Sequence, residues 1–179
     1  MIYSFLIALM SIALLTDPAQ KAPDAKKPAK LGPAVYRDSV NRFQFNRPYM
    51  AIADFQGEQP EVPDVKAMYL GAEIPGKIRP AFTLQVLPPS PNVALSQEND
   101  IAWLRSSGTL REERKIQLDK FPAVIFAADQ MVEGDTLRYV SVIAYTPTCT
   151  VNLTGLSSIS EFKKYESSFI GAIMSLKSF

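Results

Sequence analysis

Two long strands that are apolar on both faces constrain the fold of this chain more than any other feature. The sequence predicts them at Ala123–Val132 and Leu137–Thr146, on either side of a turn at residues 133–135. In the first strand, the neighbours Ile125 and Phe126 point to opposite faces and both are apolar. A strand of this kind lies in the interior of a sheet that is covered on both sides. We therefore expect this hairpin in the middle of a layered fold.

Shorter patterns predict the remaining strands. They are expected at Val35–Ser39, Phe43–Asn46, Val65–Leu70, Ala81–Leu87, Thr109–Leu118 and Thr148–Thr154. Period-two alternation indicates that Thr83 and Gln85 point outward in their strand, and that Asn152 lies opposite the apolar face of the last strand. The charges along Thr109–Leu118 favour an edge position, where charge discourages pairing with other chains.

Two helices are predicted beside these strands. Gln97–Ser107 is expected to have Ser96 as its N-cap. Ile159–Ser178 is expected to begin with a capping box made by Ser158 and Glu161. Apolar residues recur along this second helix at helical spacing, at Phe162, Tyr165, Phe169, Ile173 and Leu176. The fold class is therefore α+β, a mostly antiparallel β-sheet with helices packed on it.

The N-terminal part of the chain differs in composition from the rest. Ile2–Leu15 is an almost unbroken apolar run, shorter than the roughly 20 residues that cross a membrane, and typical of a secretory signal peptide. Asp17–Pro33 is rich in Pro, Ala and Lys and is expected to be disordered. We predict a signal peptide or N-terminal anchor at 1–19, a disordered linker at 20–34 and one folded domain at 35–179. The protein is expected to be exported to the periplasm or the extracellular space, and an uncleaved leader would tether it to the membrane.

The composition excludes several kinds of chemistry. The chain has no histidine and one cysteine, Cys149, so the commonest general base, the commonest metal ligand and an internal disulfide are all absent. A formal net charge of +1 is too small for a surface that binds nucleic-acid phosphates. We expect a protein that is not an enzyme, that needs no cofactor, and that binds no nucleic acid.

Short motifs at both ends of the domain resemble a known family. Tyr36-Arg37-Asp38, Phe43-Gln44-Phe45 and Pro48 look like the opening strand pair of PsbP-like domains, and residues 175–179 resemble the usual ending of their last helix. Tyr49 stands near a position where the family often has Trp. The resemblance covers about residues 35–179. It implies an α/β/α sandwich, shared with the Mog-type Ran-binding proteins, and a non-enzymatic role such as that of photosystem accessory subunits, GTPase-binding proteins, effector chaperones or envelope proteins.

Other motifs carry weaker functional signals. Gly71–Lys77 has the spacing of a phosphate-binding loop, but Ile78 stands where the magnesium-binding Ser or Thr should be, and a strand follows instead of a helix. Four acidic residues gather around one loop and form a candidate partner-contact site: Asp54, Glu58, Glu61 and Asp64. Their spacing matches no compact calcium loop. Cys149 shares a face with apolar residues and is expected to be a buried structural side chain.

Three functions remain after these exclusions. The leading hypothesis is a non-catalytic exported accessory or binding module that acts through a protein partner, with the acidic loop or the uncovered face of the sheet as contact surface. The alternative is a carrier or chaperone for a small hydrophobic ligand or peptide, with a groove lined by Trp103, Phe162 and Tyr165. An enzyme that uses only carboxylates and basic side chains is the third, although the sequence offers no pair of carboxylates at a recognisable separation.

Overall fold

A computed structural model describes residues 34–56, 64–106, 110–132 and 134–179. The expected leader at 1–19 and nearly all of the expected linker lie outside these ranges, as do Glu58 and Glu61. Neither of the described helices is both long and apolar enough to span a bilayer.

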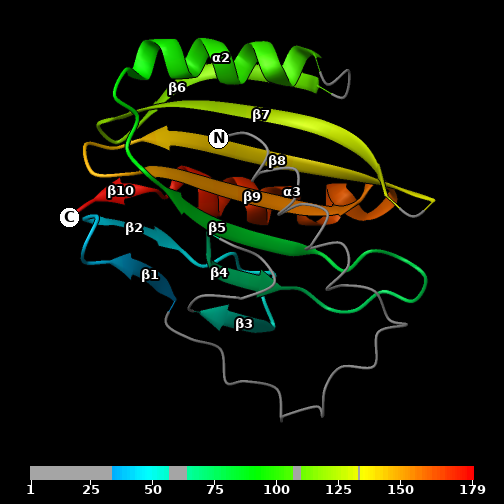
Figure 1. Cartoon of the computed structure of the whole chain (residues 1–179). Coiled ribbons are helices and arrows are strands. Elements are labelled where there is room, and N and C mark those ends of the chain that lie inside the picture. Colours follow the sequence, from blue (N-terminus) through cyan, green and yellow to red (C-terminus); the bar gives the residue numbers. More distant parts are fainter. Residues whose placement is uncertain (1–33, 57–63, 107–109, 133) are drawn as a thin grey trace.

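The described chain forms two antiparallel sheets and two helices (Figure 1). The elements are β1 (Val35–Asp38), β2 (Phe43–Asn46), β3 (Ala53–Gln56), β4 (Val65–Leu70), β5 (Ala81–Leu87), α2 (Val93–Ser106), β6 (Leu110–Leu118), β7 (Phe121–Val132), β8 (Asp135–Tyr145), β9 (Thr150–Ser158), α3 (Ile159–Met174) and β10 (Lys177–Ser178). Seven strands form the large sheet in the order β3-β4-β5-β9-β8-β7-β6, and a small sheet has the order β1-β2-β10.

The two helices lie on opposite faces of the large sheet. Helix α3 packs on β8 and β9 and also contacts β2, so one face is covered by α3 together with the small sheet. Helix α2 packs on β6 and β7 at the other face (Figure 1). The hairpin of β7 and β8 is interior and covered on both sides, and β6 is an edge strand. The structure thus confirms the layered α+β fold, the interior hairpin and the charged edge strand.

The face under α3 holds the larger core, which is built around aromatic rings. The ring of Phe169 lies 6.3 Å from that of Phe82 and 5.9 Å from that of Phe162, measured between centroids. Phe169 also covers Gly155 on β9, where an added Cβ would come 2.2 Å from the Cγ of Phe169. Only a residue without a side chain allows the helix to lie this close to the strand.

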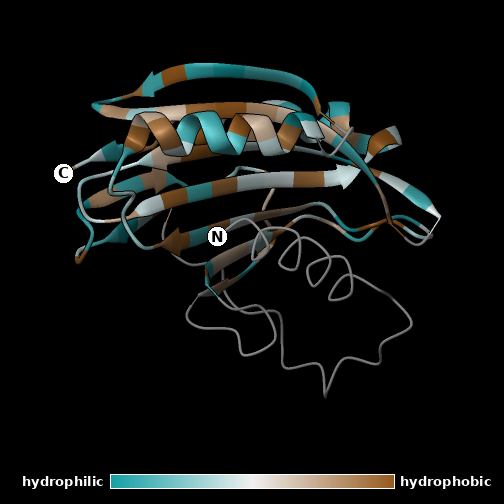
Figure 2. Ribbon diagram, turned by 45° about the horizontal axis from the view of Figure 1, so that its top comes forward, coloured by the Kyte–Doolittle hydropathy of each residue, from teal (hydrophilic) through white to brown (hydrophobic). Residues whose placement is uncertain are grey.

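The face under α2 is more lightly covered. Only Ile101 and Leu104 of this helix are buried. Figure 2 shows hydrophobic and hydrophilic bands that follow each other along α2, so the helix has no continuous apolar side. It is attached to the sheet by a few contacts, including a hydrogen bond of 2.6 Å that the hydroxyl of Tyr145 donates to Oδ2 of Asp100.

The predicted start of the first helix was wrong. Helix α2 begins at Val93, and Asn92 is its cap, because Oδ1 of Asn92 accepts a hydrogen bond of 3.1 Å from the backbone N–H of Leu95. Ser96 lies inside the first turn, and its hydroxyl bonds to that of Ser90 at 2.6 Å. Asn and Ser are both good N-caps, so the residue types alone did not separate the two positions.

The predicted capping box and end of the last helix were also wrong. Ser158 makes no side-chain cap to α3. Its Oγ accepts a bond of 3.0 Å from the backbone N–H of Ile78 and donates to Oδ2 of Asp135, so tertiary contacts use the hydroxyl instead. Helix α3 ends at Met174, after which the chain turns and adds β10 to the small sheet.

Gly155 offers a direct test of the packing between α3 and β9. Replacing Gly155 with Ala should lower the free energy of unfolding by about 2–3 kcal/mol, because the methyl group overlaps the ring of Phe169. The matched control is Gly171→Ala on the open side of α3, where a Cβ meets nothing within 4 Å. Its stability should stay the same or rise by up to about 1 kcal/mol. Urea unfolding of both variants measures the difference, and equal stabilities would contradict the packing described.

Candidate functional site

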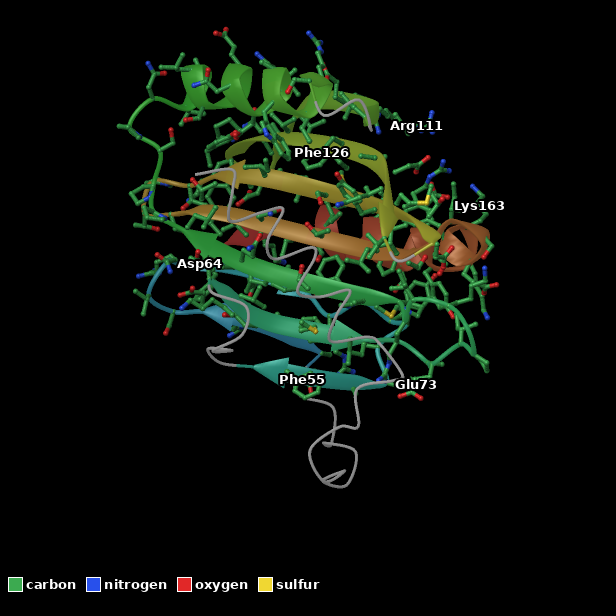
Figure 3. The ribbon with its side chains drawn as sticks, turned by 45° about the vertical axis from the view of Figure 1, so that its right-hand side comes forward. Phe55, Asp64, Glu73, Arg111, Phe126 and Lys163 are labelled. Atoms are coloured by element: carbon green, nitrogen blue, oxygen red, sulfur yellow. The ribbon has the colours of Figure 1, made fainter. Side chains whose placement is uncertain are left out.

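One row of side chains crosses the large sheet on the face of α2. Backbone pairing aligns residues from β3 to β7 in this row, in the order Phe55, Met68, Thr83, Thr154, Ser141 and Phe126. Figure 3 places Phe55 on the edge strand β3 and Phe126 beneath α2, at opposite ends of the row. The ends of the row are therefore apolar and its middle is polar.

The polar middle continues into the neighbouring row, where Gln85 of β5 pairs with Asn152 of β9. We call Thr83, Gln85, Ser141, Asn152 and Thr154 the polar strip. Side-chain hydrogen bonds connect four of its members. Nδ2 of Asn152 donates to Oε1 of Gln85 at 2.9 Å, Oγ1 of Thr154 donates to Oδ1 of Asn152 at 3.3 Å, and the hydroxyls of Ser141 and Thr154 are 2.6 Å apart. The chain of bonds runs across β8, β9 and β5.

The polar strip is buried, and one of its donors has no acceptor. Exposed fractions range from 0% at Ser141 to 4% at Asn152. The side-chain nitrogen Nε2 of Gln85 is buried and has no hydrogen-bond partner in the described structure. A buried donor without an acceptor costs roughly 1–3 kcal/mol. A buried unpaired group calls for an explanation, such as an ordered water, an ion or a functional role.

The polar strip is electrically neutral, and its surroundings are apolar. None of its five side chains ionises, so its hydrogen bonds do not depend on pH. Met68 of β4 and Ile143 of β8 lie next to it in the two rows and pack within the smaller core. On α2, the carboxylate of Asp100 is bonded to the hydroxyl of Tyr145. Burial raises the pKa of Asp100, and the hydrogen bond from Tyr145 opposes that rise.

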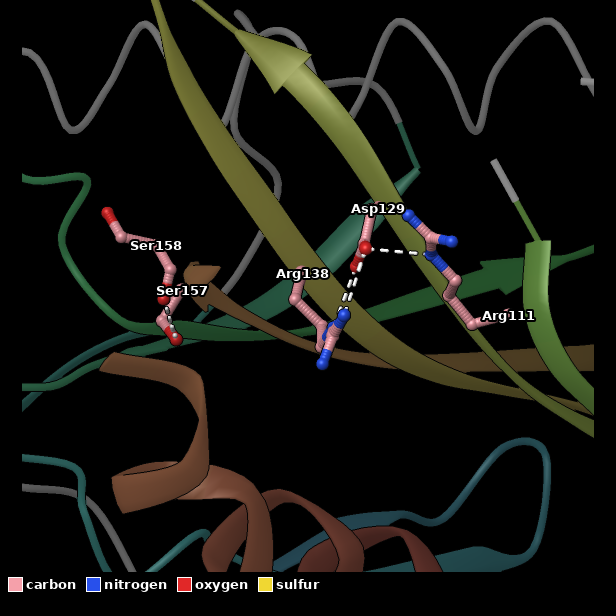
Figure 4. Close-up of polar contacts among 5 residues, drawn as sticks. All are labelled: Arg111, Asp129, Arg138, Ser157 and Ser158. Carbon is pink, nitrogen blue, oxygen red and sulfur yellow. Dashed lines mark hydrogen bonds and ion pairs between the residues drawn. The ribbon is translucent and has the colours of Figure 1, made fainter. Parts of the chain in front are cut away.

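A second polar cluster joins β6, β7 and β8 through Arg111, Asp129 and Arg138 (Figure 4). Asp129 of β7 accepts a bond of 2.8 Å from Nε of Arg111 on β6, and bonds of 2.7 and 2.9 Å from Nε and Nη2 of Arg138 on β8. Hydrogen bonding from Arg138 holds the pKa of Asp129 below its ordinary value. The carboxylate of Asp129 is bonded by two guanidinium groups, one on each neighbouring strand, and this holds the edge strand β6 to the sheet. We call these three residues the clamp.

The predicted acidic contact residues do not form one surface in the described chain. Asp54 lies in β3, which the sequence analysis had assigned to a loop, and is only 8% exposed. It pairs with Tyr69 of β4, whose hydroxyl has a raised pKa because of burial and, next, because of the charge of Asp54. Asp64 is exposed at the start of β4. Glu58 and Glu61 lie outside the described residues, and partner contact at this segment stays a prediction.

The predicted ligand groove is divided by the sheet. Trp103 packs with the smaller core under α2, whereas Phe162 and Tyr165 belong to the core under α3. Since the seven-stranded sheet separates these residues, they line no common space. A surface depression of about 380 Å³ lies between α2 and β6, beside Arg105 and Glu113.

Other motifs have structural roles in the described chain. Gly71–Lys77 lies in the connection between β4 and β5, and Gly76 provides a left-handed turn with φ of 68°. Cys149 is 2% exposed, as predicted, and burial raises the pKa of its thiol. Among the residues that the structure describes, His, Cys, Asp and Glu form no group of three or more that could hold a metal ion.

Comparisons with known proteins identify the fold. No family model matches the chain, and no curated protein matches it by sequence. The solved structures that resemble it include three bacterial proteins. Cyanobacterial PsbP from Synechocystis sp. PCC 6803 has a TM-score of 0.61 and 10% identity, covering 87% of this chain and 99% of that one. PA94 of Pseudomonas aeruginosa, described as a putative regulator of unknown function, has a TM-score of 0.56 and 11% identity, covering 81% and 96%. LpqN of Mycobacterium tuberculosis, involved in cell envelope biogenesis, has a TM-score of 0.53 and 12% identity, covering 75% and 82%.

These similarities confirm the PsbP-like fold that the short motifs predicted. At identities of 10–12% the similarity concerns the fold and not the function. The functional residues of this chain therefore have to come from its own structure. Among the described residues, three buried side-chain atoms have no hydrogen-bond partner, namely Gln44 Oε1, Tyr69 Oη and Gln85 Nε2, and the last of them belongs to the polar strip.

The clamp on β6 makes a quantitative prediction about stability. Replacing Asp129 with Asn should lower the free energy of unfolding at pH 7 by about 1–3 kcal/mol, because charged hydrogen bonds to Arg111 and Arg138 are lost. The matched control is Glu112→Gln, which breaks an ion pair with Arg114 whose side chains are 62% and 66% exposed. The control should change stability by less than about 1 kcal/mol.

The lowered pKa of Asp129 also predicts how the stability difference between wild type and Asp129→Asn depends on pH. The folded state lowers the pKa of Asp129 from its ordinary value of 3.8. Its contribution to stability is therefore complete above that value and is lost as the pH falls through the lower, folded pKa. The difference between wild type and Asp129→Asn should shrink below about pH 4, and a constant difference across this range would contradict the clamp.

Proposed function

We propose that this chain is a non-catalytic accessory module that acts outside the cytoplasm by binding a protein partner. The observation that carries the proposal is the polar strip, a chain of neutral side chains that ends in a buried, unpaired donor at Gln85. Neutral hydrogen-bonding groups hold a ligand in place, but they supply neither a general acid nor a nucleophile activated by a base.

The similar structures support a role of this class. One is the cyanobacterial PsbP, one is described as a putative regulator and one is involved in cell envelope biogenesis. The last of these is consistent with the export expected from the apolar run Ile2–Leu15. Because the groove expected for a carrier is divided by the sheet, we propose no second function.

Purification of the tagged protein tests the proposal. A tag at the C-terminus, mild detergent extraction of the native envelope and mass spectrometry should recover a protein partner at a fixed stoichiometry, and peptides from residues 1–19 would show that the leader is retained. A cytoplasmic protein tagged in the same way serves as the control for proteins that copurify non-specifically. Recovery of the protein alone, or turnover of a defined substrate by the purified protein, would contradict the proposed function.

A further inference from the structure

We propose that an acidic, extended segment of the partner protein binds a basic surface on the outer side of the small sheet. The inference rests on the proposed function and specifies a contact surface that is separate from the polar strip, together with the charge of the segment that it binds. Four exposed residues make up this surface, which we call the basic patch: Arg37, Arg42, Lys120 and Lys177.

The small sheet has one face toward the core and one toward solvent. Tyr36 of β1 stacks on Phe45 of β2 with ring centroids 5.2 Å apart, and both pack in the larger core. Because side chains alternate along a strand, Arg37 and Gln44 point to the other face. Arg37 on β1 and Lys177 on β10 both pair with Gln44 of β2, so the two basic side chains share this outer face (Figure 1).

The ring of Phe179 orients two of the guanidinium groups. Phe179 follows β10 and is 44% exposed. The Cζ atoms of Arg37 and Arg42 lie 5.6 and 5.9 Å from the centroid of its ring. Nε of Arg42 donates to the carbonyl oxygen of Phe179 at 3.2 Å, so the terminal nitrogens of Arg42 remain as donors. A guanidinium group stacked on a ring keeps donors at its edge, where a carboxylate binds with two parallel hydrogen bonds.

The cations of the patch have no acidic side chain to pair with. Elsewhere in the described chain most arginines and lysines are held by a carboxylate, as Arg79 is by Glu73 and Arg138 by Asp129. None of the four patch residues forms an ion pair with an acidic side chain within the described ranges. The patch is therefore complementary to an acidic partner.

Two acids border the patch, and both are bonded to other groups. Oδ1 of Asp38 accepts hydrogen bonds of 3.0 and 2.8 Å from backbone N–H groups of its own turn. Oδ2 of Asp119 accepts bonds of 3.0 and 2.7 Å from the backbone N–H and the hydroxyl of Ser178. These bonds lower the pKa of Asp119, and the charge of Lys120 lowers it further. Lys120 is thus partly balanced by Asp119, and the other three cations contribute most of the charge of the patch.

A surface depression of about 290 Å³ adjoins the patch. Arg42 and Lys120 line it together with the rings of Phe121 and Phe179, and no Asp or Glu is among the described residues around it. The depression has room for a side chain of the bound segment, and its cations favour an acidic one.

The spacing of the patch favours a segment with several carboxylates over a single anion. Strands of a sheet lie about 4.8 Å apart, so Arg37 and Lys177, which have β2 between them, are about 10 Å apart at the backbone. A single carboxylate bonded to one of these groups leaves the other unpaired. Acidic residues at alternate positions of an extended chain lie about 7 Å apart on one face, within reach of both side chains.

The position of the Phe179 ring favours a protein segment over an anionic membrane. A protein that binds at a membrane surface inserts exposed apolar side chains that lie beside its basic ones. In the patch the ring of Phe179 is instead stacked against the guanidinium groups of Arg37 and Arg42. We therefore assign the patch to acidic peptide and use lipid vesicles as a competing case in the experiment.

The probe is a capped, fluorescent peptide of about eight residues, within the usual length of a strand, in which Glu and Ser alternate. Its binding to the full chain is followed by fluorescence anisotropy in a neutral detergent, and a Gly-Ser linker separates any tag from Phe179. Binding should be saturable, and a peptide with Gln in place of Glu should bind at least about tenfold more weakly. Lowering the ionic strength from about 0.15 M to 0.01 M should strengthen binding of the Glu peptide, because screening weakens.

Variants locate the binding on the patch. The double variant Arg37→Gln, Lys177→Gln should weaken binding of the Glu peptide by about three- to tenfold at an ionic strength of about 0.15 M. Its matched control is Lys163→Gln, Lys164→Gln, which removes two exposed charges near the start of α3 and should change binding by less than about twofold. Arg37→Lys keeps the charge and should retain most of the binding, which separates lost charge from altered structure. Circular dichroism confirms that each variant is folded.

Four outcomes would overturn this inference. Equal binding of the Glu and Gln peptides would show that charge does not select the segment. Binding that the patch variant leaves unchanged would place the peptide elsewhere, for example on the lysines of residues 20–34. Competition by inorganic phosphate at the concentration of the peptide would assign the patch to a small anion. Binding to phosphatidylglycerol vesicles that falls in the patch variant, without binding of the peptide, would assign it to lipid headgroups.

Purification of the tagged protein separates failure of the inference from failure of the proposed function. If a partner is recovered and its complex survives Arg37→Gln, Lys177→Gln, the proposed function holds and the patch is the wrong surface. If no partner is recovered, the proposed function itself fails, whether or not the acidic peptide binds.

Discussion

The ring of Phe169 occupies the space that a side chain at position 155 would need. This contact brings α3 onto β9 and fixes which face of that strand points to the helix. Because side chains alternate along a strand, Gly155 and Leu153 face the aromatic core, whereas Thr154 and Asn152 face the opposite side. The position of α3 on β9 therefore also determines that the polar strip lies on the face of the sheet away from α3.

The polar strip is unusual because it lies in the middle of the sheet. All nine residues of β9 are buried, and a fully buried interior strand is normally apolar on both faces. Here one face carries Asn and Thr, whose hydrogen bonds run to Gln85 and Ser141 on the neighbouring strands. An apolar strand would stabilise the fold without a donor left unpaired at Gln85, so the strip costs stability in the middle of the sheet.

The sequence predicted the features that depend on local periodicity. The hairpin of β7 and β8 was recognisable because both of its faces are apolar, and β6 because charges line it. Strand β3 was missed because its four residues give too short a pattern and a segment with Pro60 and Pro63 follows them, so Asp54 was assigned to a surface loop. The cap at Asn92 was missed because Ser96 is an equally good residue type for that position.

The candidate site could be predicted only in part. Thr83 and Gln85 were correctly separated from the inward-facing residues of their strand, but they were expected to meet solvent. Gln85 and Asn152 are 67 positions apart in the sequence, and their hydrogen bond depends on β9 inserting between β5 and β8. Strand order is a property of the whole fold, so no local pattern could show that these polar residues meet.

The side-chain amide of Gln85 gives the most direct test of the central claim, that its nitrogen Nε2 is buried in the sheet without an acceptor. Nitrogen–proton correlation NMR resolves this amide, and its loss in Gln85→Glu assigns the signal. The protons of Nε2 should exchange slowly with solvent because they are buried, and should resonate at higher field than those of Nδ2 of Asn152, which donates to Gln85. Exchange as fast as that of the exposed Gln117, or the lower-field position of a hydrogen-bonded amide, would contradict the account.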